Sequence, residues 1–520
     1  MTRSLSKKVG IASLIMMASV FLSRVVGLFR EMVIAHIGGA GAAVDAYQVA
    51  FVIPDILNHV VASGFMSVTF IPIFSRYLAD NREDDGWMVF SIILNCLGCF
   101  LVALIIVAVA LTPQLIALIA PGLKNPDTIA NAVRMTRIIL PAQLFFFVGG
   151  LLMAVQFSKE KFFIPAMAPL LYNLGIISGG LILGPWIGIE GFAWGVLIGA
   201  FSGNLFIQFF GVRQAGIKYF FNFDLGHPAL KQYVFLTLPL MLGLTMTFST
   251  EFFFRLFGSY LPQGSIAVLN YGLRIMLILV GLFGQAVGTA SYPFLARLVA
   301  ENKLNEMNRL LNNTLRFLAM VIPFSVLLMV LRSEVVRIIF QRGKFDAAAT
   351  ALTAEVLIFL LIGTFAFAAY TVVVRGYFAS QNTLFPALYG TIVVIVSIPL
   401  YLLGMNLLGV RGVALAVSVS GIFQVTVLYA LWNKRSNNTE SREVYTFYVK
   451  VMCFAAGLGI FLVWFKSVAL DWIDATTFIG SLTMCALTGA VFLLILLGAG
   501  YGLKIKEVTE LVDRLVKKPH

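Results

Sequence analysis

Charged residues are scarce in this 520-residue chain. Only 12% of its residues are Asp, Glu, Lys or Arg, whereas 60% are hydrophobic. Soluble globular chains carry about 25% charged residues, and disordered chains are poor in hydrophobic residues. The composition therefore excludes both classes and leaves an integral membrane protein. The apolar runs are about 20 residues long, whereas the strands of a membrane barrel need about 10 residues of alternating polarity. The sequence predicts an all-α polytopic membrane protein.

Cysteine and histidine are also rare, with four residues of each type. Cys96 and Cys99 form a CxxC motif, but the motif lies inside an apolar run, which favours packing over metal binding or redox chemistry. The histidines are scattered along the chain, and neither a GxxxxGK[ST] phosphate loop nor an HExxH motif occurs. We therefore expect no catalytic residues, no metal site and no cofactor, and the chain is not predicted to be an enzyme.

The apolar windows predict fourteen membrane-spanning helices. They cover residues 10–37, 45–75, 87–111, 131–157, 163–185, 189–212, 232–260, 265–295, 312–331, 350–378, 384–405, 411–432, 445–466 and 475–502. Because this number is even, both termini are expected on the same side of the membrane.

Basic residues indicate which side that is. With the N-terminus inside, cytoplasmic segments hold 22 of the 37 Lys and Arg residues and outer segments hold 7. Cytoplasmic loops of membrane proteins are enriched in Lys and Arg, so both termini are predicted in the cytoplasm. The same enrichment explains the net charge of +13 without a nucleic-acid partner. One segment, 332–344, is basic on the predicted outer side.

The chain repeats itself at a constant offset of 221 in the numbering. Pro72 matches Pro293, Gly122 matches Gly343, and the segment 188–193 matches 409–414. The offset predicts an N-terminal lobe at 1–221, a C-terminal lobe at 222–442, and two additional helices with a tail at 443–520. Six helices per repeat make the two halves parallel. Two parallel halves are typical of transporters, in which the substrate site lies between the lobes near the middle of the membrane.

Several charged residues lie inside predicted spans, where an arginine costs about 2.5–3.5 kcal/mol. They are Arg24, Arg30 and Glu31 in the first helix, Glu251 and Arg255 in the seventh, and Arg274 in the eighth. We expect the four arginines to line the cleft and bind substrate. The alternative, an ion pair that fixes neighbouring helices, stays open for Glu31 and for Glu251 with Arg255. An excess of arginine over carboxylate indicates an anionic substrate, and the guanidinium fork suits phosphate.

Other polar residues extend this candidate site. Ser23 and Gly27 share a stripe of the first helix with Arg30, and Gly27 would allow close approach of a neighbouring helix. Asp45 is either a capping charge or a cavity residue, and Asn58 and His59 lie in the middle of the second helix. Three further arginines near helix ends are expected to extend toward the membrane interface; they are Arg134, Arg137 and Arg375.

Two segments carry a family resemblance. Residues 23–31 (SRVVGLFRE) with 39–47 (GAGAAVDAY), and residues 261–274 (LPQGSIAVLNYGLR), are similar to the signature of the MurJ (MviN) family, which belongs to the multidrug/oligosaccharidyl-lipid/polysaccharide exporter superfamily. The resemblance implies a flippase that moves lipid II, the undecaprenyl-pyrophosphate-linked peptidoglycan precursor, to the outer leaflet of the bacterial inner membrane by alternating access. It implies that Arg24, Arg30 and Arg274 grip the pyrophosphate, and that the last two helices hold the lipid tail.

The sequence departs from the family pattern at several positions. Asn58, His59 and Ser63 stand where many members have a basic pair and a glutamate. Phe254, Ser397 and Tyr401 occupy the positions of a sodium site, which puts sodium coupling in doubt. A flippase for another polyprenyl-pyrophosphate glycan is the alternative function. A cation-coupled drug antiporter fits less well because it needs acidic residues, and a glycan polymerase and a scaffold are further rivals. The membrane potential could reset the empty cationic carrier. No protein partner is predicted.

Overall fold

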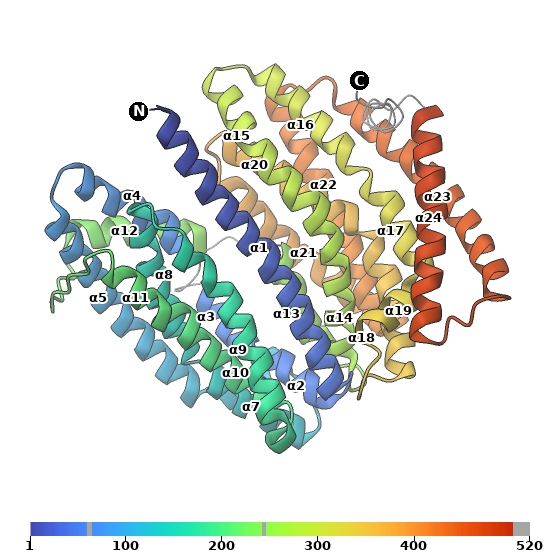
Figure 1. Ribbon diagram of the computed structural model, residues 1–520, viewed down its shortest axis with the longest axis horizontal. Helices are drawn as coiled ribbons and strands as arrows, with labels where there is room; N and C mark the ends of the chain where they lie inside the picture. The colour runs from blue at the N-terminus through green and yellow to red at the C-terminus, as the bar shows by residue number, and fades with distance from the viewer. Residues whose placement is uncertain (1, 60–64, 242–245, 503–520) are drawn as a thin grey trace. The chain divides into compact units, whose positions relative to one another are not determined.

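The computed structural model describes residues 2–59, 65–241 and 246–502, and every regular element in these ranges is a helix (Figure 1). The predicted all-α membrane architecture is confirmed. Within the described ranges, ten helices are long and apolar enough to cross a membrane. They become eleven if two helices bent by 42°, Ala347–Ile362 and Thr364–Ala379, form one span.

The predicted number of fourteen spans is not confirmed. The three predicted spans outside these eleven are 10–37, 45–75 and 232–260. The first is one helix, but it carries two arginines and a glutamate within eight residues. The second and third include residues 60–64 and 242–245, which lie outside the described ranges; their described parts are helices at Ala42–Ala50, Val52–Leu57 and Phe65–Ala79, and at Pro228–Met241 and Met246–Gly258. These three segments hold nearly all of the charges that the sequence placed inside the membrane.

Contacts divide the chain into two compact units. Unit 1 comprises Met1–Tyr271, Arg342–Ala349 and Thr383–Val413. Its helices are α1 (Thr2–Gly38), α2 (Ala42–Ala50), α3 (Val52–Leu57), α4 (Phe65–Ala79), α5 (Glu83–Ala110), α6 (Thr112–Ile119), α7 (Pro126–Ile139), α8 (Ala142–Ser158), α9 (Phe163–Ile187), α10 (Glu190–Ala200), a π-helix (Phe201–Phe206), α11 (Ile207–Arg213), α12 (Pro228–Met241), α13 (Met246–Gly258) and α21 (Leu384–Leu408).

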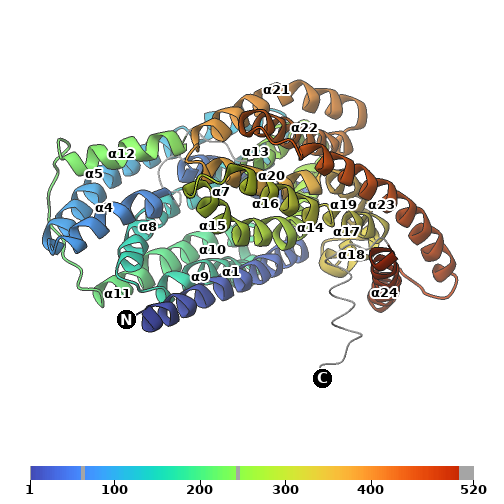
Figure 2. The same ribbon diagram turned by 90° about the horizontal axis from the view of Figure 1, so that it is seen from above.

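Glycines allow α9 to lie directly against α10, and α9 also contacts α1 (Figures 1 and 2). A Cβ atom added to Gly179 would stand 2.4 Å from the Cα of Gly195, and one added to Gly175 would stand 2.4 Å from the Cα of Gly199. Small residues of this kind let the backbones of membrane helices approach closely. The α9–α10 pair therefore forms a rigid support for α1, which carries the candidate site.

Unit 2 comprises Gly272–Gln341, Thr350–Asn382 and Ala414–His520. Its helices are α15 (Ala286–Ala300), α16 (Leu304–Leu318), α17 (Val321–Val330), α18 (Arg332–Phe340), α19 (Ala347–Ile362), α20 (Thr364–Ala379), α23 (Ser441–Leu470) and α24 (Phe478–Gly502). The helices α14 (Ser265–Leu279), α19 and α22 (Val410–Ser436) contribute residues to both units. A π-helix at Val280–Gln285 joins α14 to α15.

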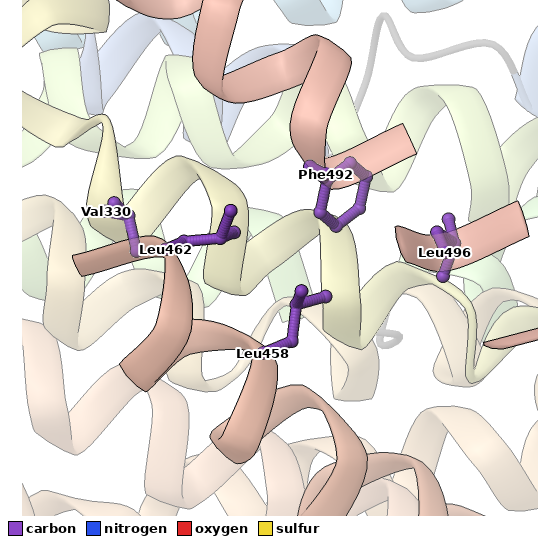
Figure 3. Close-up of a cluster of buried hydrophobic side chains, with 5 residues drawn as sticks. All are labelled: Val330, Leu458, Leu462, Phe492 and Leu496. Carbon is purple, nitrogen blue, oxygen red and sulfur yellow. The ribbon is translucent and has the colours of Figure 1, made fainter. Parts of the chain in front are cut away.

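The two helices that follow the repeat, α23 and α24, are anchored by an apolar cluster. Figure 3 shows Leu458 and Leu462 of α23 beside Val330 of α17 and Phe492 and Leu496 of α24. Leu462 and Phe492 have no solvent exposure. A buried ion pair strengthens this attachment, because Lys466 Nζ lies 2.8 Å from Glu334 Oε2 of α18. Outward-facing side chains of α23 and α24, such as Ile460 and Leu494, are exposed and apolar, as expected for a lipid-facing surface.

The backbone repeats at the offset of 221 that the sequence predicted. Helix α9 begins at Phe163 and ends at Ile187, and α21 begins at Leu384 and ends at Leu408, so both ends match at this offset. The helices α4 and α15 are related in the same way. The glycines that follow α9 and α21 have φ angles of 62° and 59°. The predicted pair of repeats is therefore confirmed. The two compact units do not coincide with the two repeats, because α12, α13 and α21 of the second repeat group with unit 1. The domain boundaries at 221 and 442 stay a prediction.

Candidate functional site

The polar arc of α1 forms a hydrogen-bonded cluster in unit 1. Arg30 Nη2 lies 2.5 Å from Glu31 Oε1, and Arg30 Nη1 donates to Asn173 Oδ1 of α9 at 3.1 Å. The side chain of Arg30 is 20% exposed and that of Glu31 is 4% exposed. Consecutive residues point about 100° apart on a helix, so Glu31 reaches inward while its partner stays at the edge of the cluster. Glu31 therefore forms the ion pair that the sequence left open as its alternative role.

Asn173 is the residue of this cluster that the sequence reasoning missed. It is buried, and its amide Nδ2 donates to the carbonyl oxygen of Pro169 at 2.8 Å and approaches Ser23 Oγ at 3.5 Å. An amide in the middle of an apolar span was the available signal. A Cβ atom on Gly27 would lie 3.8 Å from Asn173 Oδ1, which is an ordinary contact. The glycine is therefore compatible with close packing but does not set the distance between α1 and α9.

Arg24 lies nearly two helical turns before Arg30 on α1 and is exposed, whereas Arg274 is half-buried on α14. Arg24 and Arg30 belong to unit 1, and Arg274 belongs to unit 2. Arg30 retains one buried donor, its Nε, without a hydrogen-bond partner among the described residues. A guanidinium with part of its donor set uncommitted, such as that of Arg30, can still bind an anion such as a phosphate.

Asp45 caps a helix other than its own. Its carboxylate oxygens accept hydrogen bonds from the backbone N–H groups of Gly264 at 2.5 Å and Ala267 at 2.8 Å. These groups stand at the start of α14, where backbone donors lack partners inside the helix. Asp45 is 3% exposed. The sequence suggested a capping charge for α2, and the structure assigns the cap to α14, which carries Arg274.

Arg255 is held by two carboxylates. Its Nη1 lies 3.1 Å from Asp55 Oδ2 of α3, and its Nη2 lies 3.6 Å from Glu251 Oε2 of α13. Arg255 is 6% exposed. Two negative charges already surround this guanidinium, so the geometry favours fixing α3 against α13 over binding an anion. Asp55 was the unrecognised member, although its carboxylate inside a predicted span was visible in the sequence.

Asn58 and His59, two of the departures from the family pattern, lie directly after α3. Asn58 and His59 form the start of a π-helical turn, and both are half-buried. The imidazole of His59 stacks on the ring of Phe248, with ring centroids 5.2 Å apart. Ser63 lies outside the described residues. A π-helical turn frequently marks a functional position, and the π-helix Val280–Gln285 begins at the position that matches His59 in the repeat.

The positions proposed for sodium are filled by packing interactions. Tyr401 stacks on Phe257 with ring centroids 5.2 Å apart, and Phe254 is buried. Ser397 Oγ donates to the carbonyl oxygen of Val394 in its own helix. In the part of the chain that the structure describes, no group of three His, Cys, Asp or Glu residues is placed to hold a metal ion.

The described helices define a multi-pass α-helical membrane protein whose helix boundaries repeat at an offset of 221. Comparison with known proteins gives the particular family. The sequence matches the family described as lipid II flippase MurJ over residues 34–483, which is most of the chain. The chain belongs to this family.

Individual relatives agree with the family match. A probable lipid II flippase MurJ from Rhizobium tropici is 27% identical over 424 residues, covering 80% of this chain and 79% of that protein. A solved structure of lipid II flippase MurJ in an inward closed conformation matches with a TM-score of 0.74 at 25% identity, over 93% of this chain and 98% of the other. A multidrug resistance MATE family transporter of the MOP superfamily, in an inward-facing conformation, shares the fold with a TM-score of 0.62 at 16% identity, over 80% and 94% of the two chains.

Proposed function

We propose that this chain moves lipid II from the inner to the outer leaflet of the bacterial cytoplasmic membrane. The observation that carries the proposal is the family match over residues 34–483. The substrate joins an undecaprenyl tail to a peptidoglycan precursor through a pyrophosphate. The pyrophosphate that joins the two parts is an anion. Arginine is the side chain whose planar fork binds phosphate through two parallel hydrogen bonds.

In this proposal the arginines of α1 contact the pyrophosphate first. Arg24 is exposed, and Arg30 is held in position by Asn173 and Glu31. A positioned guanidinium loses little side-chain entropy on binding, which strengthens each hydrogen bond that it forms. Arg274 of unit 2 contacts the same pyrophosphate at some stage of transport. Arg255 has a supporting role, since its two carboxylate partners already satisfy its charge.

Transport proceeds by alternating access with no bond made or broken in the substrate. The headgroup binds from the cytoplasmic leaflet, the lobes rock, and the headgroup leaves on the outer side while the tail stays in lipid. Binding of an anion relieves repulsion among the arginines, so substrate favours closure. The empty carrier is cationic. A membrane potential contributes about 2.3 kcal/mol per charge per 100 mV, which returns it to the inward state without a bound sodium ion.

This mechanism requires both termini in the cytoplasm, as the excess of Lys and Arg in the inner loops indicates. It requires no catalytic residue, metal or organic cofactor. The apolar surfaces of α23 and α24, with exposed side chains such as Ile460 and Leu494, would accommodate the undecaprenyl tail.

The test is rescue of bacteria depleted of their own lipid II flippase, with lipid II exposed on the outer leaflet as the measured quantity. We expect the wild-type chain to restore exposure and Arg24→Ala, Arg30→Ala and Arg274→Ala to lose most of it. Arg213→Ala is the matched control, because Arg213 is an exposed arginine in the last turn of α11. Activity that ignores both the membrane potential and Arg24→Ala would contradict the mechanism.

One observation favours a second substrate, another polyprenyl-pyrophosphate glycan. Asn58 and His59 stand at the end of α3 in place of a basic pair, and His59 is stacked on Phe248. The peptide stem of lipid II carries carboxylates. A site with fewer cations near the headgroup would therefore favour a glycan that has no peptide stem. If a well-expressed wild-type chain fails to expose lipid II but exposes a peptide-free lipid-linked glycan, the alternative replaces the first proposal.

A further inference from the structure

Arg375 of α20 lies across the neighbouring helix α15. It stands in the last part of α20, and its Nη2 donates to Thr289 Oγ1 of α15 at 3.0 Å. The guanidinium occupies the space over Gly288, where an added Cβ atom would stand 1.8 Å from Arg375 Nη1. Only glycine at this position lets the side chain reach Thr289. Arg375 therefore contacts the neighbouring helix, and its extension toward the membrane interface stays a prediction.

The charge of Arg375 has no counter-charge within the described residues. Its Nη1 is buried and has no hydrogen-bond partner there, and no ion pair of this guanidinium occurs in the part of the chain that the structure describes. Thr289 does not compensate for it. The single hydroxyl proton of Thr289 is donated to the carbonyl oxygen of Gln285 at 2.7 Å, so Thr289 only accepts from the arginine. A buried donor without a partner is destabilising, so an anion that accepts a hydrogen bond from Nη1 would stabilise this arrangement.

Comparison of the two repeats shows that helix packing does not need this arginine. The counterpart of Arg375 at the offset of 221 is Ala154 in α8, and the counterpart of Thr371 is Gly150. Helix α8 packs on α4 as α20 packs on α15, and Ala154 is fully buried. The same helix pair is therefore built with alanine in one half of the molecule and with a charged arginine in the other. A charged arginine that helix packing does not require points to a role in binding a ligand.

Arg274 and Thr289, the hydrogen-bond partner of Arg375, lie on one continuous helical segment. Thr289, which fixes the guanidinium, lies fifteen residues after Arg274 along the segment Ser265–Ala300. The fifteen residues between them make about four turns, even though the π-helix Val280–Gln285 has slightly wider turns, so both positions fall on the same broad face, with Thr289 exposed. We propose that Arg375, Thr289 and Gly288 form a further phosphate-binding position, which receives the pyrophosphate of the polyprenyl substrate nearer the cytoplasmic leaflet than Arg274. This inference rests on the proposed function for its substrate.

The position is tested by binding, separately from transport. The full-length chain in nanodiscs is titrated with undecaprenyl pyrophosphate, with undecaprenol, and with phosphatidylglycerol. We expect Arg375→Ala to weaken undecaprenyl pyrophosphate binding about tenfold, the usual loss for a hydrogen bond to a charged group, and to leave undecaprenol binding unchanged. Arg375→Lys should retain an intermediate affinity, because lysine keeps the charge but not the fork. Arg213→Ala is the matched control and should bind as wild type does.

Gly288→Ala provides a second, independent variant, because its methyl group would displace the guanidinium while the arginine is kept. It should reproduce the loss seen with Arg375→Ala. Unchanged binding of undecaprenyl pyrophosphate in both variants would overturn the inference, and so would an equal loss for undecaprenol or phosphatidylglycerol. If the wild type binds undecaprenyl pyrophosphate through Arg375 but does not expose lipid II in cells, the function proposed above fails and this binding position stands.

Discussion

Arg30 and Arg255 are both arginines of apolar helices, yet their surroundings give them different tasks. Arg30 faces one carboxylate and one neutral amide, and its Nε has no hydrogen-bond partner among the described residues. Arg255 is almost fully buried between two carboxylates. A guanidinium with donors to spare can bind an incoming phosphate, whereas one enclosed by two negative charges mainly stabilises its neighbours.

At this scale the first prediction concerns Asn173. Asn173→Asp places a second carboxylate beside Arg30, and we expect it to reduce outer-leaflet lipid II exposure at least tenfold, because the cation is then neutralised by the protein itself. Asn173→Ala should cost about tenfold through loss of the hydrogen bond that positions Nη1. Asn131→Ala is the control, since Asn131 also accepts from an arginine, Arg134, but on an exposed face. Full activity of Asn173→Asp would exclude this role for Arg30.

The second prediction concerns the cap that Asp45 provides. Asp45→Ala leaves two backbone donors at the start of α14 unsatisfied, and loss of a cap costs about 1–2 kcal/mol. We expect a lower thermal unfolding midpoint for the purified protein in detergent, with Asp45→Asn losing less because one acceptor remains. Asp127→Ala, in the exposed first turn of α7, should leave the midpoint nearly unchanged. Equal midpoints for Asp45→Ala and Asp127→Ala would show that the cap is dispensable.

At the scale of elements, buried ion pairs determine which helices stay together. Asp55 and Arg255 join α3 to α13 in unit 1, and Glu334 and Lys466 join α18 to α23 in unit 2. Each pair connects a short or interrupted helix to a longer one. A short helix has few backbone hydrogen bonds of its own, so its position depends on such contacts.

The third prediction follows from the first of these pairs. Arg255→Gln leaves Asp55 and Glu251 without their cation, and breaking a buried pair costs about 3–5 kcal/mol. We expect a clearly lower unfolding midpoint and a smaller amount of folded protein. The affinity for undecaprenyl pyrophosphate per folded molecule should stay the same, in contrast to Arg30→Ala, which should lose affinity but little stability. A tenfold loss of affinity in Arg255→Gln at unchanged stability would instead make Arg255 a substrate-binding residue.

At the scale of the whole molecule, the internal repeat appears as a repeated backbone. Gly188 and Gly409 follow α9 and α21, and both adopt left-handed φ angles near 60°. Open space surrounds both positions, since no atom lies within 4 Å of an added Cβ atom. The need for glycine there is therefore conformational and not a matter of packing.

The fourth prediction compares these two glycines. Gly188→Ala and Gly409→Ala should each lose about 1–3 kcal/mol of stability, because a φ angle near 60° combined with ψ angles of −137° and −132° is a backbone conformation that only glycine adopts readily, and the two losses should be similar. Gly457→Ala in α23, which also has open space around it, should instead gain up to about 1 kcal/mol, since alanine favours a helix. The unfolding midpoints of the three variants measure this. A loss confined to one glycine would mean that the two halves differ in local strain.

The sequence by itself determined the class of molecule, the repeat and the candidate arginines. Scarce charge and long apolar runs require a helical membrane protein, because backbone groups in lipid must be hydrogen-bonded within each span. The constant offset of the repeat and the charges at Arg24, Arg30 and Arg274 are also local properties that can be read along the chain. The predicted number of spans is not confirmed in the segments 10–37, 45–75 and 232–260, the last two of which include residues outside the described ranges.

Only the tertiary structure decided which polar groups become partners. Asn173 meets Arg30 across 143 residues, Asp45 meets Ala267 across 222, and Asp55 meets Arg255 across 200. Helical periodicity says which face a side chain occupies, but it does not say which distant helix will pack there. Packing selects the partners at that distance. The glycine contacts between α9 and α10 and the position of the Arg375 guanidinium over Gly288 are two examples. The arginines proposed to bind phosphate were therefore visible in the sequence, and the contacts that surround each of them were set by the fold.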